Sequence, residues 1–192
     1  MQEVSVVIPN FNGMAYLDGV LSSLERQTID NFEVILVDNG STDGSCAFVA
    51  AEYPWVHMIQ NYGFSRAVNE GIHAARSPYV LLLNNDTEAE PDFLEEMVAS
   101  LRRHKKAFSC QARMIQLHDR DKMDDAGNYY CALGWAYAKG KGRDINNYNK
   151  EQKIFSTCAG AAIYRKKIID RIGDFDEEHF AYLEDLDIGY RA

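Results

Sequence analysis

The chain has 192 residues, of which 46% are hydrophobic and 26% charged, with 13 glycines and 4 prolines. This is the composition of one ordinary globular domain, and it excludes a disordered, collagen-like or coiled-coil chain. Twenty basic against 29 acidic side chains give a net charge of −9, so no general basic field attracts nucleic acid, which is excluded as a partner. A phosphate-bearing ligand would need a cation or a few local donors beside it, so a divalent metal is worth seeking.

In the first 105 residues, strand and helix patterns alternate. Short apolar runs that end in turn residues predict buried strands. They lie at Val4–Ile8, Phe32–Val37, Val56–Ile59 and Tyr79–Leu83. Helical spacing and capping residues predict helices over 13–27, over a short segment that ends at Glu52, from a cap at Ser65 to Ala75, and from Pro91 to near His104. Strands joined by helices form a parallel sheet with helices on its faces, so the predicted class is α/β with a Rossmann-like, mostly parallel central sheet.

Polar residues directly follow each of these strands. They are Pro9-Asn10, Asp38-Asn39, Asn61 to Gly63 and Asn84-Asn85-Asp86. Because ligands of such sheets bind beyond the carboxyl ends of the strands, we expect these four segments to meet at one crevice.

The second half is less regular. A strand is predicted over 107–117, and the polar stretch 119–152 reads as a long excursion with hairpins, anchored by Tyr129, Tyr130, Leu133, Trp135 and Tyr137. Loops of this length inside a domain are usually functional. Residues 155–164 should return to the core, and 165–172 should be helical.

The cysteines show no metal-binding or paired spacing. Cys46, Cys110, Cys131 and Cys158 contain no CxxC pair, so we expect reduced, mostly buried thiols. The first ten residues lack the basic region of a secretory leader, and the longest uncharged apolar stretches fall well short of the roughly 20 residues of a spanning helix. A cytoplasmic location is therefore expected.

Two aspartates follow predicted strands. Asp86 would stand at the mouth of the crevice, where a hard divalent ion could bind between a protein oxygen and ligand phosphates; the alternative is a turn or cap residue. Asp38 could accept the N–H of a base or a ribose hydroxyl, or close an Asx turn. Ser41 and Asp43 are expected mainly to cap the next helix.

Further candidates lie on two predicted helices. Arg66 and Asn69 can lean toward the strand ends, where Arg66 would pair with a diphosphate or simply with Asp86. In the last helix, Glu184 and Asp187 share a face while Asp185 points about 100° away. The macrodipole accounts for acids in a first turn, but apolar neighbours would desolvate a carboxylate and make it a better proton acceptor.

Several common catalytic signatures are absent from the sequence. It contains no HExxH, no GxGxxG and no P-loop pattern, which argues against zinc-protease, dinucleotide and P-loop chemistry. No GxSxG nucleophile elbow occurs either.

Six segments in order resemble a family 2 glycosyltransferase, in particular the bacterial rhamnosyltransferase-like members. They are VSVVIPNFNG at 4–13, VILVDNGSTDGS at 34–45, NYGFSRAVNEGI at 61–72, YVLLLNNDTEAEP at 79–91, CAGAAIYRKKIIDRIGDFDEEHF at 158–180 and YLEDLDIGYR at 182–191. The resemblance implies a single GT-A domain over 1–192, with a nucleotide-sugar-binding half at 1–105 and an acceptor-binding half at 106–192. It also implies a nucleotide-diphospho-sugar donor, Mn²⁺ or Mg²⁺, inversion at the anomeric carbon, and a role in polysaccharide biosynthesis.

The resemblance also assigns roles to residues. Asp185 resembles the general base, with Glu184 supporting it or binding the acceptor, and Asp86 resembles the metal ligand. The nucleotide-sugar-binding residues would be Pro9, Asn10, Phe11, Asp38, Asn61, Gly63, Arg66, Asn69 and Asn85. The donor would be a UDP- or dTDP-sugar and the acceptor a saccharide or lipid-linked saccharide, with acceptor specificity expected in 119–152 and near 158–160. A homodimer and peripheral association with the cytoplasmic face of the membrane stay open.

Two features depart from the family pattern. Asn84 replaces the first Asp of a stricter DxD motif, and the sequence stops seven residues after Asp185, where family members usually continue, as expected of a truncated form. A catalytically silent nucleotide-sugar-binding module is therefore the alternative function, and a glycoside hydrolase, which needs two carboxylates and no nucleotide, is a third.

Overall fold

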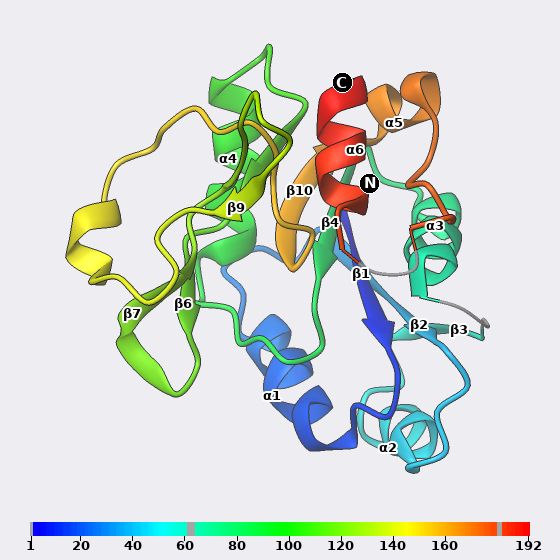
Figure 1. The fold of residues 1–192 in the computed structure, drawn as a ribbon. Helices are drawn as coiled ribbons and strands as arrows, with labels where there is room; N and C mark the ends of the chain where they lie inside the picture. Colours follow the sequence, from blue (N-terminus) through cyan, green and yellow to red (C-terminus); the bar gives the residue numbers. More distant parts are fainter. Residues whose placement is uncertain (1, 61–63, 180–181) are drawn as a thin grey trace.

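The computed structural model describes residues 2–60, 64–179 and 182–192, with only the backbone for residues 64 and 65. In this part of the chain, six strands form a central sheet in the order β3-β2-β1-β4-β10-β5 (Figure 1). They are β1 (Val4–Asn10), β2 (Phe32–Asp38), β3 (His57–Gln60), β4 (Tyr79–Leu83), β5 (Ser109–Gln111) and β10 (Ala161–Arg165). The predicted strands of the first half are confirmed to within one or two residues.

The sheet is mostly parallel, as predicted. β3, β2, β1 and β4 run parallel, and the register of β1 and β2 sets Asn10 opposite Asp38. β10 then runs antiparallel between β4 and β5. The carboxyl ends of the four parallel strands therefore lie at one edge, with the amino-terminal end of β10 beside them.

Helices cover both faces of the sheet. α1 (Met14–Glu25), α2 (Ser45–Glu52) and α4 (Phe93–Arg103) lie on one face, and α3 (Phe64–Ala74), α5 (Lys166–Ile172) and α6 (Glu184–Arg191) lie on the other (Figure 1). Side chains alternate along β1: Val6 and Ile8 pack toward the first set of helices and Val7 toward the second. Both faces are apolar because both are covered, which explains the continuous apolar runs in the sequence.

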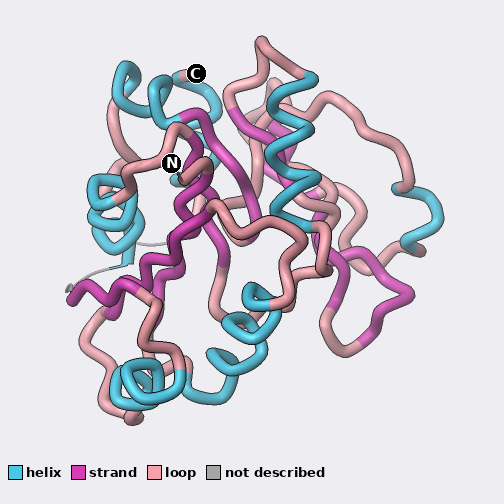
Figure 2. Tube along the Cα trace, turned by 180° about the vertical axis from the view of Figure 1, so that it is seen from behind, coloured by secondary structure: helices cyan, strands magenta, loops and turns pink. Residues whose placement is uncertain are grey.

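The excursion at 119–152 forms hairpins, as predicted. β6 (Met114–Gln116) pairs with β7 (Asp119–Asp125), β8 (Asn128–Tyr130) pairs with β9 (Ala136–Ala138), and a short helix η1 (Ile145–Tyr148) follows. Figure 2 shows the β6–β7 hairpin extending away from the central sheet.

Three expectations from the sequence need correction. The single strand predicted over 107–117 is two strands, because β5 pairs with β10 and β6 leaves the sheet to pair with β7. Of the predicted aromatic and apolar anchors, Tyr129 and Tyr137 stack on each other, but Leu133 and Trp135 at the hairpin tip are 86% and 72% exposed. The four cysteines are free, as expected, but only partly buried.

Throughout the described ranges, every helix is too short or too polar to pass through a lipid bilayer.

Gly71 allows α3 to pack directly against the sheet. A Cβ at this position would lie 2.2 Å from Cγ1 of Val7 and 3.1 Å from Cγ2 of Val37. We expect Gly71→Ala to lower the free energy of unfolding by about 1–3 kcal/mol, since overpacking a rigid sheet outweighs the gain of about 1 kcal/mol in helix propensity.

Urea unfolding measures this effect, and Gly19→Ala in α1 is the matched control. A Cβ at Gly19 would meet only the flexible Glu88 side chain, at 3.5 Å, so that variant should be neutral or more stable. Equal stabilities for the two variants would show that α3 can shift away from β1 at little cost.

Candidate functional site

Asn10 joins three of the four strand ends predicted to converge. Its side chain is 1% exposed, and its Nδ2 donates to Asp38 Oδ1 at 3.0 Å and to Ser45 Oγ at 3.2 Å. Its Oδ1 accepts a hydrogen bond from Asn85 Nδ2 at 2.8 Å. The ends of β1, β2 and β4 are thus fastened together, while the fourth segment, with the predicted residues Asn61 and Gly63, lies outside the described residues.

The carboxylate of Asp38 accepts hydrogen bonds mainly from the loop that follows it. Oδ2 accepts from the backbone N–H groups of Gly40 and Ser41, and Oδ1 accepts from Asn10 and from the Ser41 hydroxyl. Burial would raise the pKa of Asp38, but the hydrogen bonds from Ser41 and Asn10 outweigh it and hold the pKa below its usual value. Asp38 therefore closes an Asx turn here, and a nucleobase would have to displace one of these bonds to reach it.

Asp43 caps helices, as predicted. Its Oδ1 accepts from the N–H of Ser45 at 3.0 Å and its Oδ2 from the N–H of Met14 at 2.9 Å, so one carboxylate serves the first residues of α2 and α1. Ser41 does not share this role, because its hydroxyl accepts from the N–H of Asn12 instead.

Asp86 lies exposed in the loop after β4, and it has no hydrogen-bond or ion-pair partner in the described part of the chain. Across that same part, no three His, Cys, Asp or Glu side chains gather closely enough to hold a metal ion. A single free carboxylate fits a Mg²⁺ or Mn²⁺ ion that arrives with ligand phosphates, since such ions commonly take one or two carboxylates and complete their shell with phosphate and water oxygens.

The main cavity opens at the carboxyl ends of β1 and β4. It has a volume of about 530 Å³. Its lining comes from the sheet and α3, from the β7–β9 hairpins, from the segment before β10 and from the start of α6. These residues are Pro9, Val68, Leu82, Asn84, Asp125, Asn128, 136–138, 158–160, Phe175 and 182–186. Residues 158–160 and the excursion thus line the cavity, and their expected role in acceptor specificity stays a prediction.

Asp185 is the buried carboxylate of this cavity. It is 9% exposed, and burial, followed by the nearby charges of Glu184 and Asp125, raises its pKa to about 6. Asn128 Nδ2 donates to Asp185 Oδ2 at 2.9 Å. This pKa leaves the group ionised at neutral pH and well matched to accept a proton.

The other two acids at the start of α6 differ from Asp185. Glu184 also lines the cavity, and its Oε2 is buried without a hydrogen-bond partner among the described residues. Asp187 forms an ion pair with Arg191 at 2.7 Å and so stabilises the helix. The expected grouping of Glu184 with Asp187 is wrong, because Glu184 joins Asp185 at the cavity while Asp187 pairs with Arg191.

Arg66, Asn69 and Phe11 lie away from the cavity lining. Arg66 is largely exposed and pairs with Glu70 at 3.6 Å, so the alternative of an ion pair with Asp86 is wrong. Asn69 is 3% exposed, and its amide bonds both the N–H and the C=O of Phe175, which fixes the loop before α6. Phe11 follows β1 and is 62% exposed, in a position to contact a ligand outside the cavity.

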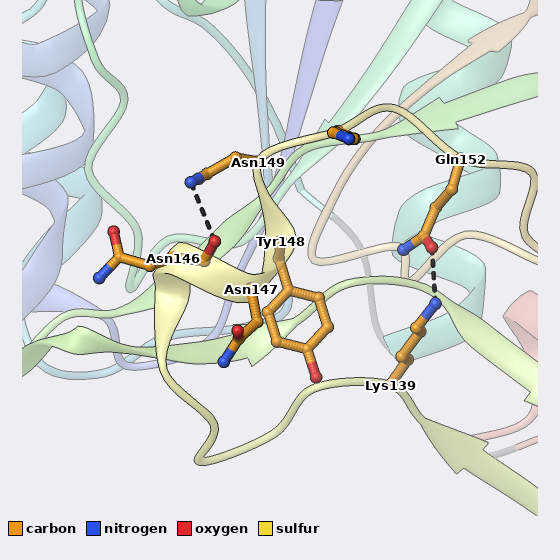
Figure 3. A pocket seen from close by; sticks show the side chains of 7 residues that line it. Lys139, Asn146, Asn147, Tyr148, Asn149 and Gln152 are labelled. Atoms are coloured by element: carbon orange, nitrogen blue, oxygen red, sulfur yellow. Dashed lines mark hydrogen bonds between the residues drawn. The ribbon is translucent and has the colours of Figure 1, made fainter.

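A second cavity, of about 390 Å³, lies within the excursion (Figure 3). Its lining is amide-rich: Lys139, 146–150 and Gln152. Lys139 Nζ donates to Gln152 Oε1 at 2.6 Å, and Asn149 Nδ2 donates to the C=O of Asn146 at 3.0 Å (Figure 3). Because no acidic side chain and no residue of the central sheet lines it, the first cavity is the candidate active site.

Two residues that line the main cavity were not predicted from the sequence. Asp125 and Asn128 lie on either side of Ala126-Gly127 in a polar stretch, where their residue types indicate only an ordinary turn. The bridge between Asn128 and the distant Ser156 brings this segment to Asp185, and no local pattern encodes that contact.

The chain is similar to known proteins in sequence and in fold. The family model described as glycosyl transferase family 2 matches residues 5–173. The putative glycosyltransferase EpsH of Bacillus subtilis is 35% identical over 102 residues, covering 50% of this chain and 29% of that protein. An N-acetylglucosaminyl-diphospho-decaprenol L-rhamnosyltransferase of Mycobacterium tuberculosis is 26% identical, covering 97% of this chain and 69% of that protein.

Solved structures share the fold. Staphylococcus aureus TarS 1–349 in complex with UDP superposes with a TM-score of 0.70 at 22% identity, covering 98% of this chain and 54% of that one. A mannosyltransferase from Pyrobaculum calidifontis in complex with GDP-Man and Mn²⁺ has a TM-score of 0.65 at 19% identity, covering 97% and 50%. The chain thus spans about half the length of these structures and less than a third of EpsH.

Proposed function

Because this chain belongs to glycosyl transferase family 2 and has its GT-A fold, we propose that it transfers a sugar from a nucleotide-diphospho-sugar to a hydroxyl group, with inversion at the anomeric carbon. The observation that carries the proposal is Asp185, a buried carboxylate with a pKa raised to about 6 in the cavity at the strand ends. The acceptor would be a saccharide or a lipid-linked saccharide. The site of action would be the cytoplasm or the cytoplasmic face of the membrane.

Asp185 would take the proton from the attacking hydroxyl as the oxygen approaches the anomeric carbon. A single displacement needs one base, and the diphosphate leaves from the opposite side of the sugar. Glu184 would bind the acceptor, since its unpartnered Oε2 is an acceptor for a ligand hydroxyl in the same cavity.

Asp86 would hold the diphosphate end of the donor through a divalent ion. When bound, Mg²⁺ or Mn²⁺ supplies charge neutralisation for the departing diphosphate. Arg66, exposed at the start of α3, would add a second positive charge. Pro9, Asn10, Phe11 and Asn85 would form the nucleotide side of the site, and a UDP- or dTDP-sugar is the proposed donor.

A thermal-shift experiment tests donor binding. We expect UDP or dTDP to raise the melting temperature of the chain only when Mn²⁺ is present, because a ligand that binds the native state alone stabilises it. At 100 times Kd the gain is about 2.7 kcal/mol, or roughly 5–10 °C for a chain of this length. UMP, which lacks the second phosphate, is the control.

The transfer assay then separates the candidate functions. Release of the nucleoside diphosphate in the presence of acceptor supports the transferase, whereas a shift without transfer would favour a silent nucleotide-sugar-binding module. No shift with any nucleoside diphosphate would contradict both and leave the glycoside hydrolase.

A further inference from the structure

Asn128 connects the excursion to Asp185. It is the first residue of β8, and its backbone forms a two-way bridge with Ser156: the N–H of Asn128 donates to the C=O of Ser156 at 3.0 Å, and the N–H of Ser156 donates back at 3.2 Å. Its side-chain Nδ2 then donates to Asp185 Oδ2 at 2.9 Å. Two backbone bonds therefore hold the residue that contacts the carboxylate.

The partner of this bridge contacts the same aspartate. Ser156 is 4% exposed, and its hydroxyl donates to the backbone C=O of Asp185. The Asn128–Ser156 bridge therefore binds Asp185 twice, through the carboxylate and through the main chain of the first turn of α6.

The turn before Asn128 is itself fastened to the sheet. Asp125 is 6% exposed, and its Oδ1 accepts from the N–H of Gly127 at 2.6 Å and from Nε2 of Gln111 in β5 at 2.8 Å. Gly127 has φ +116°, and a Cβ there would lie 2.4 Å from Cγ2 of Ile154, so the turn needs glycine. Asn128 thus stands on a rigid support.

We propose that Asn128 is a positioning residue, which holds the carboxylate of Asp185 in the orientation that receives the proton of the attacking hydroxyl. This rests on the proposed role of Asp185 as the base. The excursion would then have two roles: it is expected to contact the acceptor, and through Asn128 it orients the carboxylate of Asp185, which deprotonates the acceptor hydroxyl.

The hydrogen bond also acts on the charge of Asp185. The groups around it are Glu184 on its own helix, Asp125 from the excursion, and Cys158 and Tyr164 from the segment that leads into and forms β10. Burial and the two acids disfavour the ionised form, whereas the backbone N–H groups of Leu186 and Ala159 and the side-chain N–H of Asn128 favour it. Removing the donor therefore leaves Asp185 harder to ionise.

The test is a pH titration of Asp185 in the whole chain by carboxyl ¹³C NMR, with the signal assigned from Asp185→Asn. We expect Asn128→Leu, which keeps a similar volume without the donor, to raise the titration midpoint by about one pH unit. The acidic limb of kcat/KM should move upward with it, and kcat on the plateau should fall about 10-fold while KM for the donor stays constant.

Two variants serve as control and reserve. Asn147→Leu changes an exposed asparagine of the same excursion and should move neither the midpoint nor the pH profile. If Asn128→Leu does not fold, Asn128→Ala removes the donor and keeps the backbone bridge.

An unchanged midpoint in a folded Asn128 variant would overturn the positioning role. A midpoint that moves while the transfer profile stays fixed would instead overturn Asp185 as the base, and this proposal with it.

Discussion

Asp185→Asn is expected to lower kcat for transfer by about 10²–10⁴ and to make the chain more stable at neutral pH. The loss in rate follows because a positioned general base contributes a factor of that size and an amide cannot accept the proton. The gain in stability follows because the ionised carboxylate is buried beside Glu184 and Asp125.

The pH dependence of this stability has a definite sign. The pKa of Asp185 is about 6 in the folded chain against an ordinary value of 3.8, so between these pH values the folded state binds more protons than the unfolded state. Stability therefore falls as pH rises from about 4 to 6, by up to about 3 kcal/mol, and stays lower above that range. Asp185→Asn should be more stable than the parent at pH 8 and equal to it near pH 3.5.

Urea unfolding at the two pH values, together with the transfer rate between pH 5 and 8, measures both effects. In the parent, kcat/KM should fall below about pH 6 as Asp185 takes up a proton. Asp187→Asn is the matched control on the same helix: it loses the ion pair with Arg191, costs at most about 1 kcal/mol, and keeps transfer. A fully active Asp185→Asn would assign the base to another residue.

Asp86→Ala is expected to abolish the Mn²⁺-dependent thermal shift by nucleoside diphosphate and to lower transfer by about 10²–10³. A metal at a departing phosphate is worth several kcal/mol in the transition state, which corresponds to that factor. Because Asp86 is exposed and has no partner within the described ranges, the stability without ligand should stay constant.

Calorimetric titration with UDP, with and without Mn²⁺, gives a measurement that does not depend on turnover. Asp92→Ala is the control, since Asp92 lies on the same connection from β4 to α4 and its side chain makes no capping hydrogen bond. If Asp86→Ala retains metal-dependent binding, the ion is held elsewhere and the proposed role of Asp86 is wrong.

The first half of the fold could be predicted because its signals are local. Val4–Ile8 and Tyr79–Leu83 are continuous apolar runs since both faces of the sheet are covered, and the turn residues that follow them mark the strand ends. Because the strands are parallel, their carboxyl ends lie at the same edge of the sheet. The side chain of Asn10 forms hydrogen bonds with both Asp38 and Asn85, so these ends are in direct contact.

The second half depends on contacts between distant residues. The residues near 107–117 do not indicate that β5 pairs with β10 while β6 leaves the sheet. β5 is fixed by its partner β10, some 50 residues later in the chain, and β6 by its bulged pairing with β7. Leu133 and Trp135 are exposed but as apolar as buried residues, so residue type alone predicted that they would anchor the excursion.

The sequence by itself determined the α/β class and the family, and it proposed Asp185 as the base, because apolar runs, turn residues and ordered motifs are properties of short segments. Only the tertiary structure decided what surrounds that carboxylate: Glu184 faces the same cavity, and Asn128, 57 residues earlier in the chain, donates a hydrogen bond to it. The tertiary structure also decided that Asp38 closes a turn within its own loop. Burial and charge act through space, so the pKa of an acid and the orientation of its oxygens depend on neighbours that the order of residues does not reveal.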